Sequence, residues 1–235
     1  YPIAEDEYYH VYNRGTDRRT IFLDDHDKAR FVKLLYLANG EGAIVMENLE
    51  NLSFRELVAR NSDRKLLTAI GAYCLMPNHF HIFAKETEKG GTTKFMSKLS
   101  TGYVMYFNKR YARTGALFGG RFKAERVTDD NYLRYLFAYI HLNPIKLIDH
   151  SWKDEGIQNI EHVRDFLSRY EHSSFFDYTG VNRPQEAILS RAEFPNYFET
   201  TREFSSFIND WMEMKEAEKK ERKSQDVHKP VDKQG

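Results

Sequence analysis

Two apolar-rich segments near the middle of the chain flank a turn pair, Pro77-Asn78, and together they predict antiparallel strands of a central sheet. The segments are 66–76, LLTAIGAYCLM, and 79–85, HFHIFAK. An earlier strand is expected in residues 7–16, EYYHVYNRGT, which ends in an Asn-Arg-Gly turn. Residues 116–127, ALFGGRFKAERV, are rich in aromatic and β-branched side chains but contain a Gly-Gly pair. That segment predicts a hairpin or an irregular strand.

Three longer segments carry apolar residues at the spacing of one helix face. The first helix is expected in residues 22–40, with Asp24 or Asp25 as its N-cap and a stop at Asn39-Gly40. The second is expected in 92–115 and the third in 129–144, where Pro144 ends it. The three apolar stripes are Phe31, Leu34, Leu35 and Ala38; Phe95, Leu99, Tyr103 and Tyr106; and Leu133, Leu136, Phe137 and Ile140.

These elements predict one main domain over residues 1–150, interrupted by a charged segment at about 41–65. Within that segment, Ser53 and Glu56 form a capping box before a short helix. Residues 151–212 are expected to form a helical extension on or near the main domain, with an aromatic loop at 173–180 and a last helix opened by Thr200 and Glu203. Residues 213–235 have dense charge and no aromatic side chains, which indicates a disordered tail.

Composition narrows the class of protein. The chain of 235 residues has one cysteine, Cys74, which excludes an internal disulfide framework, and no apolar stretch long enough to span a bilayer. The acidic N-terminal residues lack the order of a signal peptide, so a cytoplasmic protein is expected. Formal net charge is zero, but residues 85–126 contain many more cations than acids. A local basic face is therefore expected rather than bulk attraction to nucleic acid.

The HFHIFAK segment raises a question about chemistry. Alternate side chains of a strand share a face, so His79 and His81 project together while Phe80 enters the core. Two imidazoles on one face can share a metal ion. They can equally be polar residues on the solvated side of an amphipathic strand, and this pattern alone does not decide between the two.

A second candidate site lies on the third helix. At about 100° per residue, Tyr139 and Asn143 lie one turn apart on a common flank, whereas His141 points roughly 160° away from Tyr139. A phenol, a carboxamide and two imidazoles are the parts needed to attack a phosphodiester with tyrosine. Ionising a phenol at pH 7 costs about 4 kcal/mol, which a polarised phosphate and a positive local field can offset.

Four ordered motifs carry a resemblance to a known family. YYHVYNRGTDRRTIF, AYCLMPNHFHIFAKE, YFNKRYARTGALFGGRFKAERV and YLFAYIHLNPIKL resemble the single-tyrosine transposases of the HUH class, and most of all the REP-associated tyrosine transposases. The resemblance covers about residues 7–150, and SSFFDYTGVNRP is similar to the C-terminal extension of that family. It implies an α+β, ferredoxin-like palm, an antiparallel sheet with helices on one side.

The resemblance also implies roles. His79 and His81 match the paired metal ligands, Tyr139 the nucleophile, and Asn143 a further amide ligand. The cofactor is expected to be Mg²⁺ or Mn²⁺, and the substrate single-stranded or hairpin DNA, which is cleaved to a 5′-phosphotyrosine and a free 3′-hydroxyl and then rejoined. Two histidines and an amide are a lean ligand set for Mg²⁺, so phosphate and water oxygens are expected to complete it.

The other tyrosines, histidines and cations have separate expected roles. Tyr135 lies about 40° from Tyr139 on the same helix and is the alternative nucleophile. The stripe tyrosine Tyr103 is expected in the core, and the remaining histidines at the surface or at caps. The cationic candidates for phosphate or guanine contacts are Arg14, Arg18, Arg19, Arg110, Arg113, Arg121 and Lys123.

Two rival functions stay open at this point. One is a domesticated DNA-binding protein without chemistry, and the other is an HUH replication initiator or relaxase. A conventional metallohydrolase is disfavoured because the chain has no H-E-x-x-H motif. No membrane partner is expected, and either a monomer or a homodimer fits.

Overall fold

The sheet at the centre of the molecule has four antiparallel strands in the order β2-β3-β1-β4. The computed structural model describes residues 3–227, together with their side chains except those of 46–48 and 218–227. Two helices complete a βαββαβ unit with this sheet, which is the ferredoxin-like arrangement that the sequence predicts. In chain order the unit is β1 (Tyr8–Arg14), α1 (Asp25–Ala38), β2 (Ala69–Met76), β3 (His79–Lys85), α4 (Gly91–Arg110) and β4 (Lys123–Arg126).

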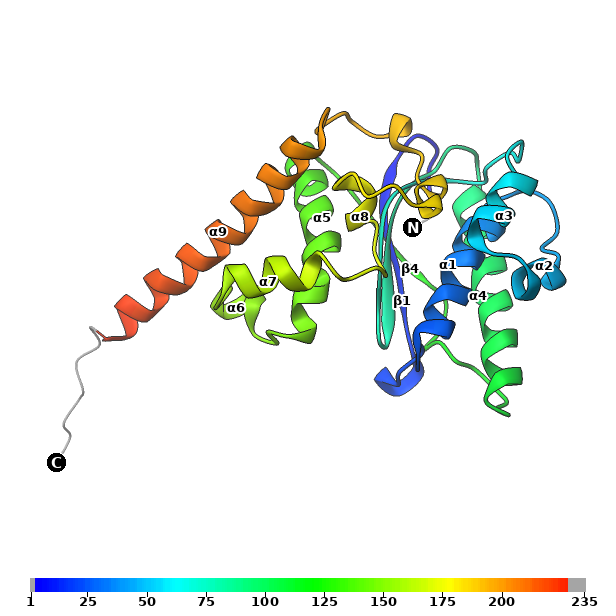
Figure 1. Ribbon diagram of the computed structural model, residues 1–235, viewed down its shortest axis with the longest axis horizontal. Coiled ribbons are helices and arrows are strands. Elements are labelled where there is room, and N and C mark those ends of the chain that lie inside the picture. The colour runs from blue at the N-terminus through cyan, green and yellow to red at the C-terminus, as the bar shows by residue number, and fades with distance from the viewer. Residues whose placement is uncertain (1–2, 228–235) are drawn as a thin grey trace.

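Helices cover both faces of the sheet (Figure 1). The expectation of helices on one side describes α1 and α4, whose Phe31 and Leu99 pack with Val11 and Ile82 of the sheet. On the opposite face, α5 (Asp130–Leu142) packs Phe137 against the sheet. Because strand side chains alternate, β1, β2 and β3 each contribute side chains to the apolar cores on both faces of the sheet. The sheet is therefore a middle layer, and one of its faces looks toward α5.

Residues 41–65 contain two short helices that enlarge the apolar core between the sheet and helices α1 and α4. They are α2 (Met46–Asn51) and α3 (Phe54–Arg60), and α3 begins with the predicted Ser53 capping box. Leu49 and Phe54 are buried in the core beside α1. The ammonium of Lys33 on α1 donates to the carbonyl oxygens of Leu49 and Leu52 at 3.0 and 2.6 Å. The segment is thus an integral part of the α1 and α4 layer.

The local sequence fixes where α5 begins and ends. The Asp129 carboxylate accepts a hydrogen bond from the backbone N–H of Tyr132 at 2.9 Å, as an N-cap does. Pro144 stops the α-helix, and the chain continues as a 3-10 helix over Asn143–Leu147. The chain then enters the C-terminal extension at α6 (Trp152–Glu155).

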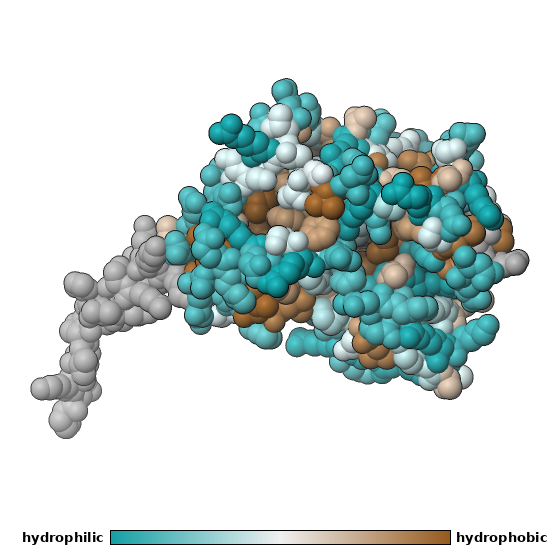
Figure 2. All heavy atoms as spheres, viewed as in Figure 1, coloured by the Kyte–Doolittle hydropathy of each residue, from teal (hydrophilic) through white to brown (hydrophobic). Residues whose placement is uncertain are grey.

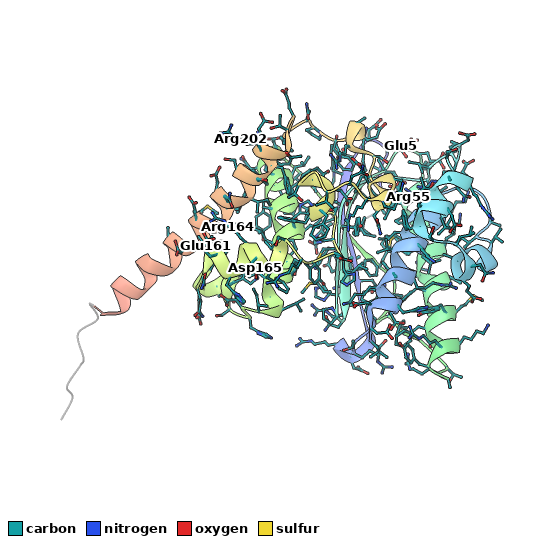
Figure 3. The ribbon with its side chains drawn as sticks, in the orientation of Figure 1. Glu5, Arg55, Glu161, Arg164, Asp165 and Arg202 are labelled. Atoms are coloured by element: carbon teal, nitrogen blue, oxygen red, sulfur yellow. The ribbon has the colours of Figure 1, made fainter. Side chains whose placement is uncertain are left out.

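The extension packs on the α5 side of the sheet. Its α-helices are α6 (Trp152–Glu155), α7 (Ile160–Leu167), α8 (Phe175–Tyr178) and α9 (Thr201–Val227), and the aromatic loop expected at 173–180 contains α8. Further 3-10 turns lie at Thr16–Arg18, Pro184–Ile188 and Arg191–Glu193. Arg164, labelled in Figure 3, joins two of these helices, since its Nε on α7 donates to Oδ1 of Asn209 on α9 at 3.0 Å.

Helix α9 extends beyond residue 212, where the sequence analysis places the start of a disordered tail. The helix continues to Val227, and residues 213–227 are rich in Glu and Lys, which have high helix propensity. The rest of the expected tail, 228–235, lies outside the described residues.

The face of the molecule in Figure 2 is mostly hydrophilic, with apolar groups between the hydrophilic ones. Within the described residues, no helix is both long and apolar enough to cross a bilayer.

The segment expected as a hairpin or irregular strand supplies β4, a short strand at the sheet edge that pairs with β1. Helix α4 ends at Arg110, before the Gly115 stop predicted for it.

Candidate active site

His79 and His81 of β3 share one face of the sheet with Tyr12 and Arg14 of β1, and this face looks toward α5. In the antiparallel register, His81 lies opposite Tyr12, and His79 lies opposite Arg14. The His79 and His81 rings are 4.9 Å apart between centroids and perpendicular to each other. The period of two along β3 therefore brings both imidazoles to one place, as the sequence predicts.

Helix α5 brings Tyr139 onto this pair of histidines. The Tyr139 ring meets His81 edge-on at a centroid separation of 5.4 Å, and it meets His10 at 5.8 Å. Asn143, one turn further along, is buried. All four predicted site residues line one cavity of about 590 Å³. The cavity is also lined by His10, Tyr12, Arg14, Arg18, Arg121, Lys123, Glu125, Lys146 and Lys153.

Hydrogen bonds to Nδ1 fix the orientation of both imidazoles. Nδ1 of His79 lies 2.6 Å from Oδ1 of Asn78, an acceptor, so Nδ1 carries the proton. Nδ1 of His81 lies 2.8 Å from Nε2 of His10. When Nδ1 of His81 donates in that bond, its Nε2 keeps a lone pair. This Nε2 atom is buried and has no hydrogen-bond partner among the described residues.

Burial keeps these imidazoles neutral. Desolvation is the main cause that lowers the pKa of His79 to about 3 and the pKa of His10 to about 4. The pKa of His81 also falls well below its ordinary value, again through burial first. Neutral imidazoles offer lone pairs, which is the form in which histidine binds a metal ion.

The donor set fits a divalent ion. It consists of the two imidazole Nε2 atoms and the carboxamide of Asn143, whose Nδ2 is buried and has no hydrogen-bond partner in the part of the chain that the structure describes. Since a half-turn of the amide exchanges its nitrogen and oxygen, the same position can offer a carbonyl oxygen. Mn²⁺ accepts imidazole more readily than Mg²⁺, and either ion would need further oxygen ligands from substrate or water.

The phenol of Tyr139 does not ionise readily by itself. Burial raises its pKa, and the neighbouring Asn143 carboxamide and the positive charge of Lys146 oppose that rise. Tyr135, the alternative nucleophile, is 39% exposed and packs against Trp211 of α9. Its ring centroid lies 5.7 Å from that of Tyr139. Tyr139 is the tyrosine of this helix that contacts the histidines.

His10 corrects a sequence expectation. It was expected at the surface or at a cap, but it is only 7% exposed and contacts His81 directly. Its Nδ1 lies 4.0 Å from Oε2 of Glu125 on β4. In the sequence, His10 is two residues from Tyr12 on the first strand, so both side chains are expected on one face. This places His10 at the site only when the pairing of β1 with β3 is known.

The predicted cationic residues fall into two groups. Arg14, Arg18, Arg121 and Lys123 line the cavity with the histidines. The other three make contacts within the protein. Arg19 pairs with Asp17 at 3.5 Å, Arg110 with Asp24 and Asp27 at 2.6 and 2.8 Å, and the Arg113 guanidinium lies over the Phe107 ring.

Asp24, His26 and Asp27 form another cluster of possible metal ligands, with ligand atoms within 4.8 Å of one another. Arg110 pairs with both carboxylates, and its Nη1 lies 2.8 Å from Nδ1 of His26. Asp27 also accepts a hydrogen bond from Tyr111 at 2.9 Å. The Arg110 guanidinium thus already occupies this cluster, and the contacts join α1 to α4.

Comparison with known protein families assigns the chain to one of them. Residues 4–143, more than half of the chain, match the family described as "Transposase IS200 like". The chain belongs to this family. No curated protein sequence matches the chain significantly.

Two solved structures are similar to the chain at low identity. One is described as "Structure of the REP associates tyrosine transposase bound to a REP hairpin", with 15% identity, a TM-score of 0.44 and coverage of 79% of this chain and 87% of that chain. The other is the tRNA(His) guanylyltransferase of Saccharomyces cerevisiae, with 13% identity, a TM-score of 0.32 and coverage of 83% and 81%. The family assignment rests on the sequence match.

Proposed function

We propose that this transposase is a metal-dependent DNA endonuclease and strand transferase, with Tyr139 as its nucleophile and structured single-stranded DNA as its substrate. One observation carries the proposal. The phenol of Tyr139 lines the same cavity as His79 and His81, and its ring contacts that of His81. A tyrosine beside two neutral imidazoles that can bind a metal ion is an arrangement that supports transfer of a phosphodiester to tyrosine.

In the proposed reaction, Oη of Tyr139 attacks the phosphorus of one phosphodiester. The Oη–P bond forms, the bond from phosphorus to the 3′-oxygen breaks, the phenol loses its proton and the 3′-oxygen gains one. A 5′-phosphotyrosine and a free 3′-hydroxyl result. Attack of another 3′-hydroxyl on the phosphotyrosine reverses the step and joins a new end.

We assign His79, His81 and Asn143 as the residues that would hold Mg²⁺ or Mn²⁺, whose role is to polarise the phosphate. The chain's own side chains have other tasks. Ionising Tyr139 at pH 7 costs about 4 kcal/mol or more, because burial raises its pKa above the ordinary value. The positive charge of Lys146 lowers this cost.

We assign DNA contacts to the four cations that line the cavity, Arg14, Arg18, Arg121 and Lys123. Arginine and lysine side chains position nucleic acid chiefly through its phosphates. Tyr12 lies among them and offers a ring on which an unpaired base can stack. We therefore assign a single strand next to a hairpin as the DNA bound in this cavity, and we propose that the reaction takes place in the cytoplasm.

The experiment uses a library of single-stranded oligonucleotides, each with a central hairpin and randomised flanks. Incubation with Mn²⁺ should produce a covalent adduct that survives denaturing electrophoresis. The adduct should be absent in EDTA and in the double variant His79→Ala, His81→Ala, although that variant should still bind the DNA. Full adduct formation in EDTA would remove the metal from the proposal. Binding by the wild-type chain without any adduct would favour a DNA-binding protein that lacks chemistry.

A further inference from the structure

The wall of the active-site cavity extends beyond the part of the chain that matches the transposase family. The match ends at residue 143, but Lys146 and Lys153 line the same cavity. Lys153 belongs to α6, the first helix of the C-terminal extension. The extension therefore contributes a side chain to the site and does more than cover the sheet.

The position of Lys153 is defined by two aromatic rings. Its Nζ lies 4.0 Å from the centroid of the Tyr139 ring and 5.6 Å from that of Trp152. Trp152 is 4% exposed and belongs to the core between the sheet and the extension. Because Trp152 anchors α6 at this place, the ammonium of the next residue is held over the candidate nucleophile.

The charge of Lys153 acts on the cavity. It is one of the causes that lower the pKa of His10, His79 and His81. Burial lowers the pKa of Lys153 itself to about 8, and the charge of Lys146 adds to that effect. At pH 7 the side chain is still mostly protonated. A partly buried ammonium is costly to desolvate, and an anion bound in the cavity would offset that cost.

We propose that Lys153 binds the scissile phosphate beside Tyr139, so that the C-terminal extension completes the active site. This inference rests on the function proposed above. The ammonium donates to a non-bridging oxygen of the phosphate. When the Tyr139 Oη–P bond forms and the bond to the 3′-oxygen breaks, that contact stabilises the added negative charge on the phosphate oxygens. No proton is transferred to or from Lys153.

Equilibrium binding tests this contact without cleavage. The probe is an oligonucleotide that the wild-type chain cleaves, prepared either with its natural scissile phosphate or with a neutral methylphosphonate there. Both are titrated in EDTA against the Tyr139→Phe protein, with and without Lys153→Met, by fluorescence anisotropy. Lys153→Met should weaken binding of the natural oligonucleotide about 10-fold, as expected for loss of a hydrogen bond to a charged group. It should weaken binding of the methylphosphonate less than about 2-fold.

Matched variants separate this contact from general effects. Lys153→Arg keeps the charge and should retain most of the affinity for the natural oligonucleotide. Lys89→Met removes an exposed lysine elsewhere and should change neither affinity. Lys153→Gln supplies a second neutral variant if the methionine variant unfolds.

Two results overturn the inference while leaving the proposed function intact. One is equal weakening on both oligonucleotides, and the other is no weakening at all, each with a wild-type chain that forms the adduct. If the wild-type chain forms no adduct with any member of the library, the proposed function fails, and the phosphate contact of Lys153 falls with it.

Discussion

Nδ1 of His81 on β3 lies 2.8 Å from Nε2 of His10 on β1, and the two rings are stacked with centroids 4.9 Å apart. His10 thus holds the imidazole of a candidate metal ligand in one orientation, and when it accepts from Nδ1 of His81, Nε2 of His81 keeps its lone pair. Partners of this kind tune the affinity of the ligands that they contact. The neighbouring strand, and not only the strand with the His-Phe-His sequence, shapes the site.

Substitution of His10 should weaken metal binding. His10→Leu removes the hydrogen-bond partner of Nδ1 of His81 and should lower the affinity for Mn²⁺ about 10-fold to 100-fold, measured by the loss of the free-ion electron paramagnetic resonance signal on titration. His10→Gln keeps an acceptor and should lose less. His162→Leu, at an exposed position, is the control. Equal Mn²⁺ affinity in His10→Leu and wild type would contradict the orienting role.

The loop that lines the cavity after β1 should not accept a side chain at Gly15. A Cβ atom there would lie 2.3 Å from the carbonyl oxygen of Arg19. Gly15→Ala should therefore lower the free energy of unfolding by about 1 to 3 kcal/mol, as overpacking does, in a denaturant titration. Gly42→Ala is the matched control, because a Cβ there meets no atom within 4 Å. Equal stability of the two variants would show that the loop adapts freely.

Ser174 tests how firmly the extension is joined to the sheet. Its Oγ accepts from the backbone N–H of Tyr73 on β2 at 3.0 Å and lies 2.8 Å from Nε2 of His141 on α5. Ser174→Ala leaves these buried groups without that partner and should cost about 1 to 3 kcal/mol in the free energy of unfolding. Ser205→Ala, on the exposed side of α9, should cost little. A neutral Ser174→Ala would mean that this junction contributes nothing.

Cys74 should be chemically inert in the folded chain. It is the chain's one cysteine, it is fully buried on β2, and burial raises its pKa. Both effects reduce the thiolate available for alkylation. Iodoacetamide should modify the native protein about 100-fold or more slowly than the protein in concentrated guanidinium chloride, as followed by intact mass. Comparable rates in the two conditions would show that the α5 side of the sheet opens readily.

The parts of the fold that follow from short-range patterns were predictable. The period of two in β3 placed His79 and His81 on one face, and the helical spacing placed Tyr139 beside Asn143 and His141 away from both. In the structure, His141 faces the extension, with Nδ1 2.9 Å from the carbonyl oxygen of Phe137. The Ser53 capping box and the Asp24 cap were also found where the sequence predicted them.

The surroundings of some residues depend on contacts between distant segments, and these could not be predicted from the sequence. His10 enters the site because β1 pairs with β3, and Lys153 enters because α6 of the extension lies beside the cavity. Arg110 shows the reverse case. It matched the cationic character of a DNA contact, but the packing of α1 against α4 supplies it with two carboxylates. Charge alone could not separate a residue of the cavity from one that joins two helices.

The identity of the tyrosine that becomes linked to DNA tests the central claim most directly. The adduct formed with the oligonucleotide library is digested with nuclease and trypsin, and the modified peptide is sequenced by mass spectrometry. The nucleotide should be joined through its 5′-phosphate to Tyr139. The Tyr139→Phe variant should form no adduct, whereas the Tyr135→Phe variant should still form one. A nucleotide joined to Tyr135, or an adduct that persists in Tyr139→Phe, would contradict the account.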